Sequence, residues 1–399
     1  MTSPLKNIKV IDMSRILAGP WAGQLLGDYG ADVVKVEKPV SGDDTRQWGP
    51  PWLGKESGYY LSTNRNKRSI TVDISIPKGQ EIIKHLVKHA DVLLENYRVG
   101  TLSRYGLDPK VLKKINPRLI YCSISAYGQT GTKATQPGYD AMIQASAGLM
   151  SITGPASNEC GGPQKVGVAI SDIMAGMYAT TAILAALNSR SLTGQGQTID
   201  VPLYDSQVAW LANQNMNFLL SSEVPQRMGT AHPNLVPYQT FTTSDGNLML
   251  AVGNDSQFKR CCKALGLQSL ASDPKFKTMS ERIENRKSLI KLLQSEFKSA
   301  STESWLKRLL EFNVPAGPVN DIGEVLTNDY AIERNLVRQI KNSVDSEVPQ
   351  VSNPVNFEDT PVEYKHAPPL LGEHTDEVLQ EWLGYSDVEI EALKKLGVV

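Results

Sequence analysis

The feature that most constrains the fold is a regular alternation of strand-like and helix-like segments in the first third of the chain. The apolar runs lie at 8–13, 32–37, 91–95 and 119–124, and the helical stretches at 20–30, 77–89 and 108–115. Strands that alternate with helices form a parallel sheet with helices on its faces. The sequence therefore predicts an α/β fold, with a Rossmann-like parallel sheet in a large domain.

A second, smaller domain is expected where the pattern changes near Arg227. Residues 240–252 have the pattern of a hairpin, with Asp245-Gly246 as its turn. Helical stretches follow near 256–266, 280–299 and 302–312. A chain of 399 residues also exceeds what one hydrophobic core usually supports. We expect a large domain at 1–200, a linker at 201–226, a small α+β domain at 227–316, and a linker with return to the large domain at 317–399.

Charge and cysteine content exclude several classes of protein. The 41 Lys and Arg residues against 42 Asp and Glu give a net charge of −1, which is no footprint for nucleic acid or an anionic membrane. The four cysteines form no Cys-x-x-Cys pair and are expected to be free thiols in a reducing compartment. Polar residues interrupt the apolar segments, so no transmembrane helix is expected, and no targeting segment is recognised at the start.

One carboxylate stands at the head of a long apolar segment. Asp172 precedes residues 173–187, which carry no charge, are apolar on every face and are therefore expected to form a buried helix. Ser171 and Asp172 suit the N-terminal end of that helix, where a carboxylate commonly caps free N–H groups. The same residue could instead be a partly desolvated nucleophile, because small neighbours such as Gly167 and Gly176 leave room for a substrate.

Three other kinds of site are disfavoured by the sequence. The turn after the first strand lacks the Gly-x-Gly-x-x-Gly pattern that lets a dinucleotide approach the backbone. His85 and His89 lie four residues apart on a predicted helix, but no Glu accompanies them as in zinc proteases, so no metal site is expected. The chain has no Gly-x-Ser-x-Gly motif of a serine hydrolase.

Basic residues favour an extended, phosphorylated ligand. Residues 64–68 contain three cations just before a predicted strand, Lys38 follows the end of another strand, and Arg98 and Arg104 follow a third. Ligands bind beyond the carboxyl ends of the strands in an open parallel sheet, so these cations could together hold the phosphates of one nucleotide. Taken singly, each is more often a solvated surface charge.

Seven short motifs resemble those of the class III CoA-transferase family, which also contains an acyl-CoA racemase. They lie at 17–20 (LAGP), 30–37 (GADVVKVE), 41–46 (SGDDTR), 66–70 (NKRSI), 91–96 (DVLLEN), 193–197 (TGQGQ) and 369–378 (PLLGEHTDEV). The resemblance implies transfer of CoA from an acyl-CoA donor, such as succinyl-CoA, to a dicarboxylic acid, such as glutarate. It also implies an interlocked, ring-like homodimer, the mitochondrial matrix as location, and no tightly bound cofactor, because coenzyme A is part of the substrates.

The resemblance assigns roles to individual residues. Asp172 becomes the catalytic nucleophile, which forms an aspartyl anhydride and then an aspartyl-CoA thioester. The positions implied to contact CoA are Leu17, Ala18, Lys38, Val72, Ser75, Asn96, Tyr97, Arg104 and Tyr139. Leu17 replaces a glutamine that shapes the site in the formyl-CoA member, so formyl-CoA and oxalate are not expected as substrates.

A dicarboxylic acid needs a cation for its far carboxylate, and arginine supplies one through a bidentate pair. The candidates are Arg15, Arg46, Arg227 and His232. Arg15 is preferred because it follows the end of the first strand. Backbone N–H groups near 17–18 or 229–230 are candidate donors to the oxyanions of the reaction.

Two alternatives stay open at this point. A racemase needs two proton-transfer groups, and the family's racemases have a histidine where this chain has Tyr139. A phenol with an ordinary pKa near ~10 is a poor base at neutral pH, which favours the transferase. A non-catalytic CoA-binding protein would be expected to lack the nucleophile, whereas this chain retains Asp172.

Overall fold

The computed structural model describes residues 3–399, which divide into two compact units. The first unit is built from Met1–Leu149, Lys165–Glu223 and Ile332–Val399, and the second from Met150–Gln164 and Val224–Ala331. Residues 150–164 group with the second unit because the Ser157 N–H donates to the Arg227 carbonyl over 3.0 Å. Residues 201–223, expected as a linker, group with the first unit.

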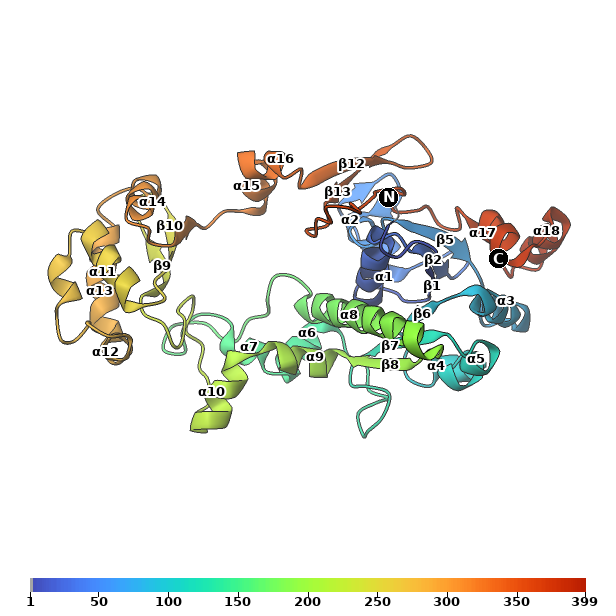
Figure 1. The fold of residues 1–399 in the computed structure, drawn as a ribbon, viewed down its shortest axis with the longest axis horizontal. Helices are drawn as coiled ribbons and strands as arrows, with labels where there is room; N and C mark the ends of the chain where they lie inside the picture. The colour runs from blue at the N-terminus through green and yellow to red at the C-terminus, as the bar shows by residue number, and fades with distance from the viewer. Residues whose placement is uncertain (1–2) are drawn as a thin grey trace. The chain divides into compact units, whose positions relative to one another are not determined.

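A six-stranded parallel sheet forms the centre of the first unit (Figure 1). Its strands are β1 (Lys9–Asp12), β2 (Asp32–Glu37), β5 (Lys67–Thr71), β6 (Val92–Glu95), β7 (Ile120–Ser125) and β8 (Thr198–Pro202). They lie in the order β5-β2-β1-β6-β7-β8, so the chain order reverses between β1 and β6. This is the doubly wound order of Rossmann-like folds, and the predicted α/β class is confirmed.

Helices cover both faces of this sheet, because consecutive strand residues point to opposite sides. The helices of the first unit are α1 (Ala18–Asp28), α2 (Gly58–Leu61), α3 (Pro77–His89), α4 (Thr101–Arg104), α5 (Pro109–Ile115), α6 (Asp140–Ser146), α8 (Ile170–Thr193), α9 (Leu203–Trp210), α10 (Asn213–Ser221), α17 (Thr375–Leu383) and α18 (Asp387–Lys395), of which α10 has no buried residue. Val10 and Val92 pack in one core with α1 and α8. Ile11 and Leu93 pack in a second core with α3, α5, α17 and α18 on the opposite face (Figure 1).

Helix α8 begins where the sequence placed it and holds Asp172 in its first turn. Its inner face packs against α1, β7 and β8. Met177 and Tyr178 on its outer face are 40% and 41% exposed, so the expected burial on every side is wrong for the single chain.

The same helix is the one in the described part of the chain that is long and apolar enough to cross a membrane, with a mean hydropathy of 1.5. No transmembrane helix was expected from the sequence, because polar residues interrupt its apolar segments. Arg190 in its last turn pairs with Asp91 at 2.8 Å, next to the start of β6. Its packing along the sheet is that of a core helix.

Two helical stretches are each divided in the structure. Residues 203–221 form α9 and α10, which are separated at Ala212, where φ is 47°. The stretch expected at 280–299 forms α12 (Met279–Glu284) and α13 (Arg286–Phe297). Strand β13 (Glu347–Val351) pairs antiparallel with β12 (Val337–Lys341).

The second unit has a three-stranded antiparallel sheet in the order β11-β10-β9. Its elements are β9 (Tyr238–Thr242), β10 (Asn247–Ala251), α11 (Asp255–Ala264), α12, α13, α14 (Thr302–Glu311), β11 (Ala316–Pro318), α15 (Ile322–Thr327) and α16 (Asp329–Glu333). Strands β9 and β10 form the predicted hairpin. The core centres on Phe297, whose ring centroid lies 4.7 Å from that of Phe241 and 5.4 Å from that of Trp305.

Candidate active site

A cavity of about 250 Å³ opens where the strand order reverses, beyond the carboxyl ends of β1, β6 and β7. Residues 15–18 after β1, 96–99 after β6 and 124–126 at the end of β7 line it, together with 136–139 and Asp172. This is the position at which open parallel sheets bind their ligands. The topology therefore brings together residues that are far apart in the sequence.

The carboxylate of Asp172 faces this cavity without a fixed partner. Ala169 occupies the N-cap position of α8, and no side chain caps the helix from that position. The Ser171 N–H donates instead to Asp140 Oδ1 over 2.8 Å. Within residues 3–399, no hydrogen bond or ion pair to the Asp172 carboxylate is formed. Asp172 is thus free for a substrate, whereas Asp140 satisfies the helix end.

Burial, together with the smaller effect of the nearby charge of Asp140, raises the pKa of Asp172 to about 7. A carboxyl group whose pKa is displaced this far, and which lies in a cleft, is typical of a functional site. At neutral pH, the carboxylate and carboxylic acid forms of Asp172 are both populated.

A hydrogen-bond network that was not predicted from the sequence fixes the start of α8 beside Asp172. Asp140 Oδ2 accepts a hydrogen bond from Gln144 Nε2 over 2.7 Å, and Gln144 Oε1 accepts one from the Val166 N–H over 2.8 Å. The Ser171 hydroxyl donates to Gln207 Oε1 over 2.8 Å. No local spacing in the sequence links Asp140 to residue 172.

A glycine lets α8 approach α1 closely at the same place. A Cβ atom on Gly176 would lie 2.6 Å from the Ala18 carbonyl oxygen and 3.2 Å from Trp21 Cβ. Helix α1 has Leu17 at its N-cap, with no side-chain cap, so the first N–H groups of the helix are available near the cavity. The second pair of candidate oxyanion donors, 229–230, belongs to the other unit.

The four candidate cations for a substrate carboxylate have different surroundings. Arg15 lines the cavity with 46% of its side chain exposed, and pairs with Asp44 at 3.0 Å. Arg46 is buried, and its guanidinium lies 2.7 Å from Glu37 and 2.8 Å from Glu56. Arg46 lines neither cavity, and both carboxylates pair with its guanidinium. The expected role of Arg46 as a ligand of the substrate carboxylate is therefore replaced by a structural one.

The other two candidates lie in the second unit. Arg227 donates through Nε to the Pro155 carbonyl over 3.3 Å. His232 accepts the Asn234 N–H at Nδ1 over 3.0 Å, and burial together with Arg286 lowers its pKa. Both therefore have partners within their own unit, and their role toward a substrate stays a prediction.

A second cavity of about 360 Å³ adjoins the first, since Arg15, Asp44 and Tyr97 line both. Of the nine expected CoA contacts, Lys38, Val72, Ser75 and Tyr97 line the second cavity, and Leu17, Ala18, Asn96, Tyr97 and Tyr139 line the first. Arg104 is exposed on α4 and lines neither. The two adjoining cavities share a wall formed by Arg15, Asp44 and Tyr97.

The cations at 64–68 do not contribute to this groove, so their expected role in binding phosphate is wrong. They lie at the amino end of β5, and each pairs with an acid. Arg65 lies 2.6 Å from Asp28, Lys67 lies 2.9 Å from Asp12, and Arg68 lies 2.6 Å from Asp32. The strand begins at Lys67, two residues earlier than predicted, which draws these side chains into the interior.

Comparison with known proteins agrees with this geometry. The family model of CoA-transferase family III matches residues 5–375. The succinate–glutarate CoA-transferase of Agrobacterium fabrum is 45% identical over 389 residues, which cover 95% of each chain. The succinyl-CoA:glutarate CoA-transferase of Homo sapiens is 44% identical over 396 residues, 99% of this chain and 90% of its own.

Among solved structures, a CAIB/BAIF family protein from Brucella suis is 44% identical, with a TM-score of 0.84 over 96% of this chain and 100% of the other. The chain belongs to CoA-transferase family III. The resemblance recognised in its motifs is therefore confirmed.

Proposed function

We propose that the protein transfers CoA between succinyl-CoA and glutarate, with Asp172 as the residue that carries the covalent intermediates. The observation that supports this most strongly is the Asp172 carboxylate, which has no partner among residues 3–399, at the cavity where the parallel sheet reverses its order. The names of the relatives from Agrobacterium fabrum and Homo sapiens support the pair of acids.

Two exchanges at Asp172 account for the donor half of the reaction. A carboxylate oxygen of Asp172 attacks the thioester carbon of succinyl-CoA, the C–S bond breaks, and CoA leaves as a thiolate. The thiolate then attacks the aspartyl carbonyl carbon, so that succinate leaves and an aspartyl-CoA thioester remains. A nucleophilic carboxylate in this way divides one difficult exchange into easier steps.

The acceptor half runs the same exchanges in reverse. Glutarate attacks the aspartyl thioester and expels the CoA thiolate, which leaves a glutaryl–aspartyl anhydride. The thiolate attacks the glutaryl carbonyl carbon, glutaryl-CoA forms, and the Asp172 carboxylate is restored. Each step begins and ends with one thiolate or one carboxylate, so no proton needs to be supplied by the protein.

Each step passes through an oxyanion that needs donors. The N–H groups at the start of α1, near Leu17 and Ala18, are suited to this task because the positive end of the helix dipole lies there. The close approach of α8 to α1 at Gly176 keeps this helix start near Asp172. The adenine nucleotide part of CoA would occupy the second cavity, with Lys38 and Ser75 at its walls.

Arg15 is our choice to hold the far carboxylate of the dicarboxylic acid. Its ion pair with Asp44 is half-exposed, and such pairs contribute only about 0–1 kcal/mol. A bidentate substrate carboxylate would therefore replace Asp44 at little cost. Tyr97, whose ring centroid lies 5.4 Å from the guanidinium carbon, limits the movement of the side chain.

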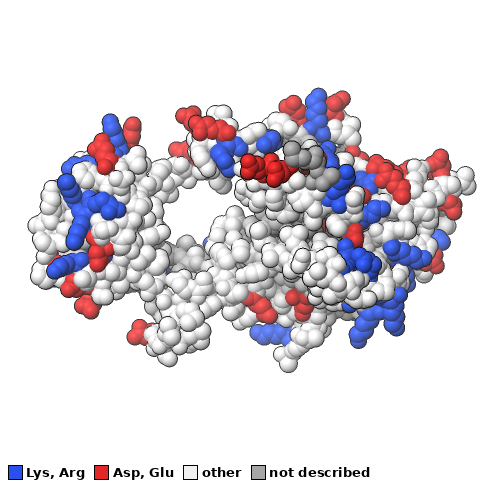
Figure 2. Space-filling model, viewed as in Figure 1, with Lys and Arg blue, Asp and Glu red and all other residues white. Residues whose placement is uncertain are grey.

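A homodimer is proposed as the working form, as the resemblance implies. Its support is the exposed apolar surface of α8 and α10. Helix α10 has no buried residue and no charged residue, and Leu219 and Leu220 are 67% and 81% exposed. Elsewhere basic and acidic side chains are interspersed over the visible surface, whereas the place of α10 is largely uncharged (Figures 1 and 2). Light scattering that gives the mass of a monomer would contradict this.

The experiment mixes the protein with succinyl-CoA and isotope-labelled glutarate and follows labelled glutaryl-CoA by mass spectrometry. Wild type is expected to form it, and Asp172→Asn is expected not to. Asp205→Asn is the matched control, because Asp205 also lies in the first turn of a helix but is exposed and lines neither cavity. Deuterium uptake at the α-carbon of a 2-methylacyl-CoA, without labelled glutaryl-CoA, would support the racemase instead.

A further inference from the structure

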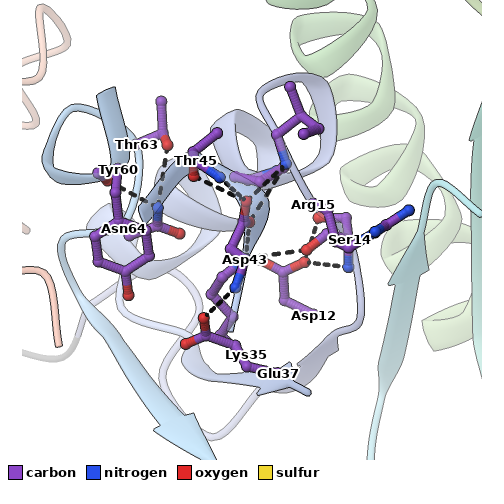
Figure 3. A network of polar contacts seen from close by, with 12 residues as sticks. Asp12, Ser14, Arg15, Lys35, Glu37, Asp43, Thr45, Tyr60, Thr63 and Asn64 are labelled. Atoms are coloured by element: carbon purple, nitrogen blue, oxygen red, sulfur yellow. Dashed lines mark hydrogen bonds and ion pairs between the residues drawn. The ribbon is translucent and has the colours of Figure 1, made fainter. Parts of the chain in front are cut away.

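Side chains hold the backbone of Ser14 and Arg15, which follow β1. The Ser14 N–H donates to Asp12 Oδ1 over 3.0 Å, and the Ser14 carbonyl accepts from Lys35 Nζ over 3.0 Å (Figure 3). The Arg15 N–H donates to Asn96 Oδ1 over 2.8 Å, and the Arg15 carbonyl accepts from Asn96 Nδ2 over 2.6 Å. Both peptide groups are therefore fixed by residues of neighbouring strand ends.

The next residue, Ile16, has an unusual conformation. Its φ is 72°, in the left-handed region, where a β-branched side chain crowds the backbone. The Ile16 N–H is 3.3 Å from both carboxylate oxygens of Asp43. Such a conformation persists only where the surroundings fix it, and residues of this kind cluster at functional sites.

Asp43 is itself fixed by buried partners (Figure 3). Lys35 Nζ lies 2.9 Å from Asp43 Oδ2, and neither side chain has any exposed surface. Thr45 donates to Asp43 Oδ1 through its N–H over 3.0 Å and through its hydroxyl over 2.8 Å. Although burial acts to raise it, Lys35 and Thr45 lower the pKa of Asp43 to about 2. Asp43 is therefore an anion throughout the neutral range.

We infer that Asp43, paired with Lys35, is a positioning residue for the reaction, because it holds Ile16 in the left-handed conformation and so sets the directions of Arg15 and Leu17. Both neighbours line the cavity that contains Asp172. A buried ion pair stabilises a fold little more than apolar residues of the same size would, so the main effect of this pair is on geometry. The inference rests on the proposed function in the task given to Arg15.

The test removes the pair without leaving one buried charge alone. Lys35→Met together with Asp43→Ala leaves Asp12 with Lys67, and Glu37 with Arg46. The kcat, the KM for glutarate and the melting temperature are measured for this double variant. A triple variant adds Ile16→Gly, because glycine adopts positive φ without steric cost.

The glutarate KM of the double variant is expected to rise about tenfold or more, because small misplacements of binding groups have large effects. In the triple variant it is expected to return to within about threefold of wild type, while the melting temperature stays at or below that of the double variant. A merely structural role would move the melting temperature and leave no rescue by glycine. An unchanged KM in the double variant, or an unrescued KM in the triple variant, would overturn the inference.

If the double variant does not fold, Ile16→Asn and Ile16→Val decide. Asparagine tolerates the left-handed region and valine does not, so the Asn variant is expected to melt at the higher temperature and to have the lower KM for glutarate of the two. The opposite order would overturn the inference. Arg15→Gln separates the two proposals. If Arg15→Gln leaves the KM for glutarate unchanged, the task proposed for Arg15 fails. If Arg15→Gln raises this KM but the Lys35 and Asp43 variants do not, only the positioning role is rejected.

Discussion

Asp140 accepts a hydrogen bond from the backbone N–H of Ser171, the residue directly before Asp172 in the chain. One acid thus satisfies the start of α8, and the other is left to face the cavity. The negative charge of Asp140 also acts on Asp172, whose pKa burial has already raised. This relationship between two carboxylates leads to a prediction for each.

Asp140→Asn should move the acid limb of the pH–rate profile to lower pH. Asparagine can still accept the Ser171 hydrogen bond, but it removes the negative charge that helps to raise the pKa of Asp172. Because the ionised form of Asp172 is the nucleophile, half-maximal kcat/KM is then reached at lower pH. Asp205→Asn, which removes a charge outside the cavity, should leave the profile where it is. A shift to higher pH would mean that Asp140 does not act on Asp172 through its charge.

Asp172→Asn should stabilise the fold at pH 8 more than at pH 5. The folded-state pKa of about 7 lies above the ordinary value of 3.8, so folding favours the protonated acid. Stability from this group is therefore complete at low pH and falls as the pH rises toward and through 7, by about 4 kcal/mol at most. Urea unfolding of both proteins at the two pH values measures the difference. An equal difference at both pH values would contradict the displaced pKa.

Arg15→Gln should raise the KM for glutarate by roughly ten- to a hundredfold, because a charge-assisted pair contributes about 1.5–3 kcal/mol. Steady-state kinetics with glutarate and with a monocarboxylic acid of similar length provide the comparison. The monocarboxylate KM should hardly change, since it has no far carboxylate. Equal effects on both acids would remove Arg15 from this role.

Asp44→Asn should have the opposite effect on the same constant. Asp44 pairs with Arg15 at 3.0 Å, so in the free enzyme it occupies the guanidinium that glutarate needs. Its neutral isostere should lower the glutarate KM by a few-fold, within the about 0–1 kcal/mol that a half-exposed pair contributes. If Asp44 instead orients Arg15 for the substrate, the KM will rise.

Gly176→Ala should destabilise the first unit and reduce kcat. The added Cβ would lie 2.6 Å from the Ala18 carbonyl oxygen, a backbone atom that cannot move alone, so α1 and α8 must separate. Such overpacking costs about 1–3 kcal/mol, which thermal unfolding will detect. Gly167→Ala is the control, since its Cβ would meet nothing within 4 Å. If both variants melt like wild type, the close approach is not important for stability.

Much of the fold could be predicted because the pattern of apolar residues reports burial directly. The strands that contain Val10, Val33 and Val92 are buried on both sides, and their uninterrupted apolar runs are visible in the sequence. Asp172 was visible for the opposite reason, as one charge before an uncharged stretch. The seven family motifs then indicated that the reaction is a transfer of CoA.

What could not be predicted depends on pairing across the fold. Arg65 and Lys67 have the composition of a surface patch, and only their distances to Asp28 and Asp12 reveal that they are internal. Asp140 is 32 positions from Asp172 in the sequence numbering, so no helical or strand spacing joins them. The break between α9 and α10 at Ala212 likewise could not be predicted, because no glycine or proline lies there.

The discontinuity of the first unit decides which fragments of this protein can be prepared. The chain leaves that unit at Glu223 and returns at Ile332, and α17 then supplies Val378, Leu379 and Trp382 to the core beside β5. Truncation from the C-terminus therefore removes α17, which packs against β5, before it reaches the second unit. The first unit with both cavities would be obtained by excising both segments of the second unit, 150–164 and 224–331, and joining the cut ends, not by truncation.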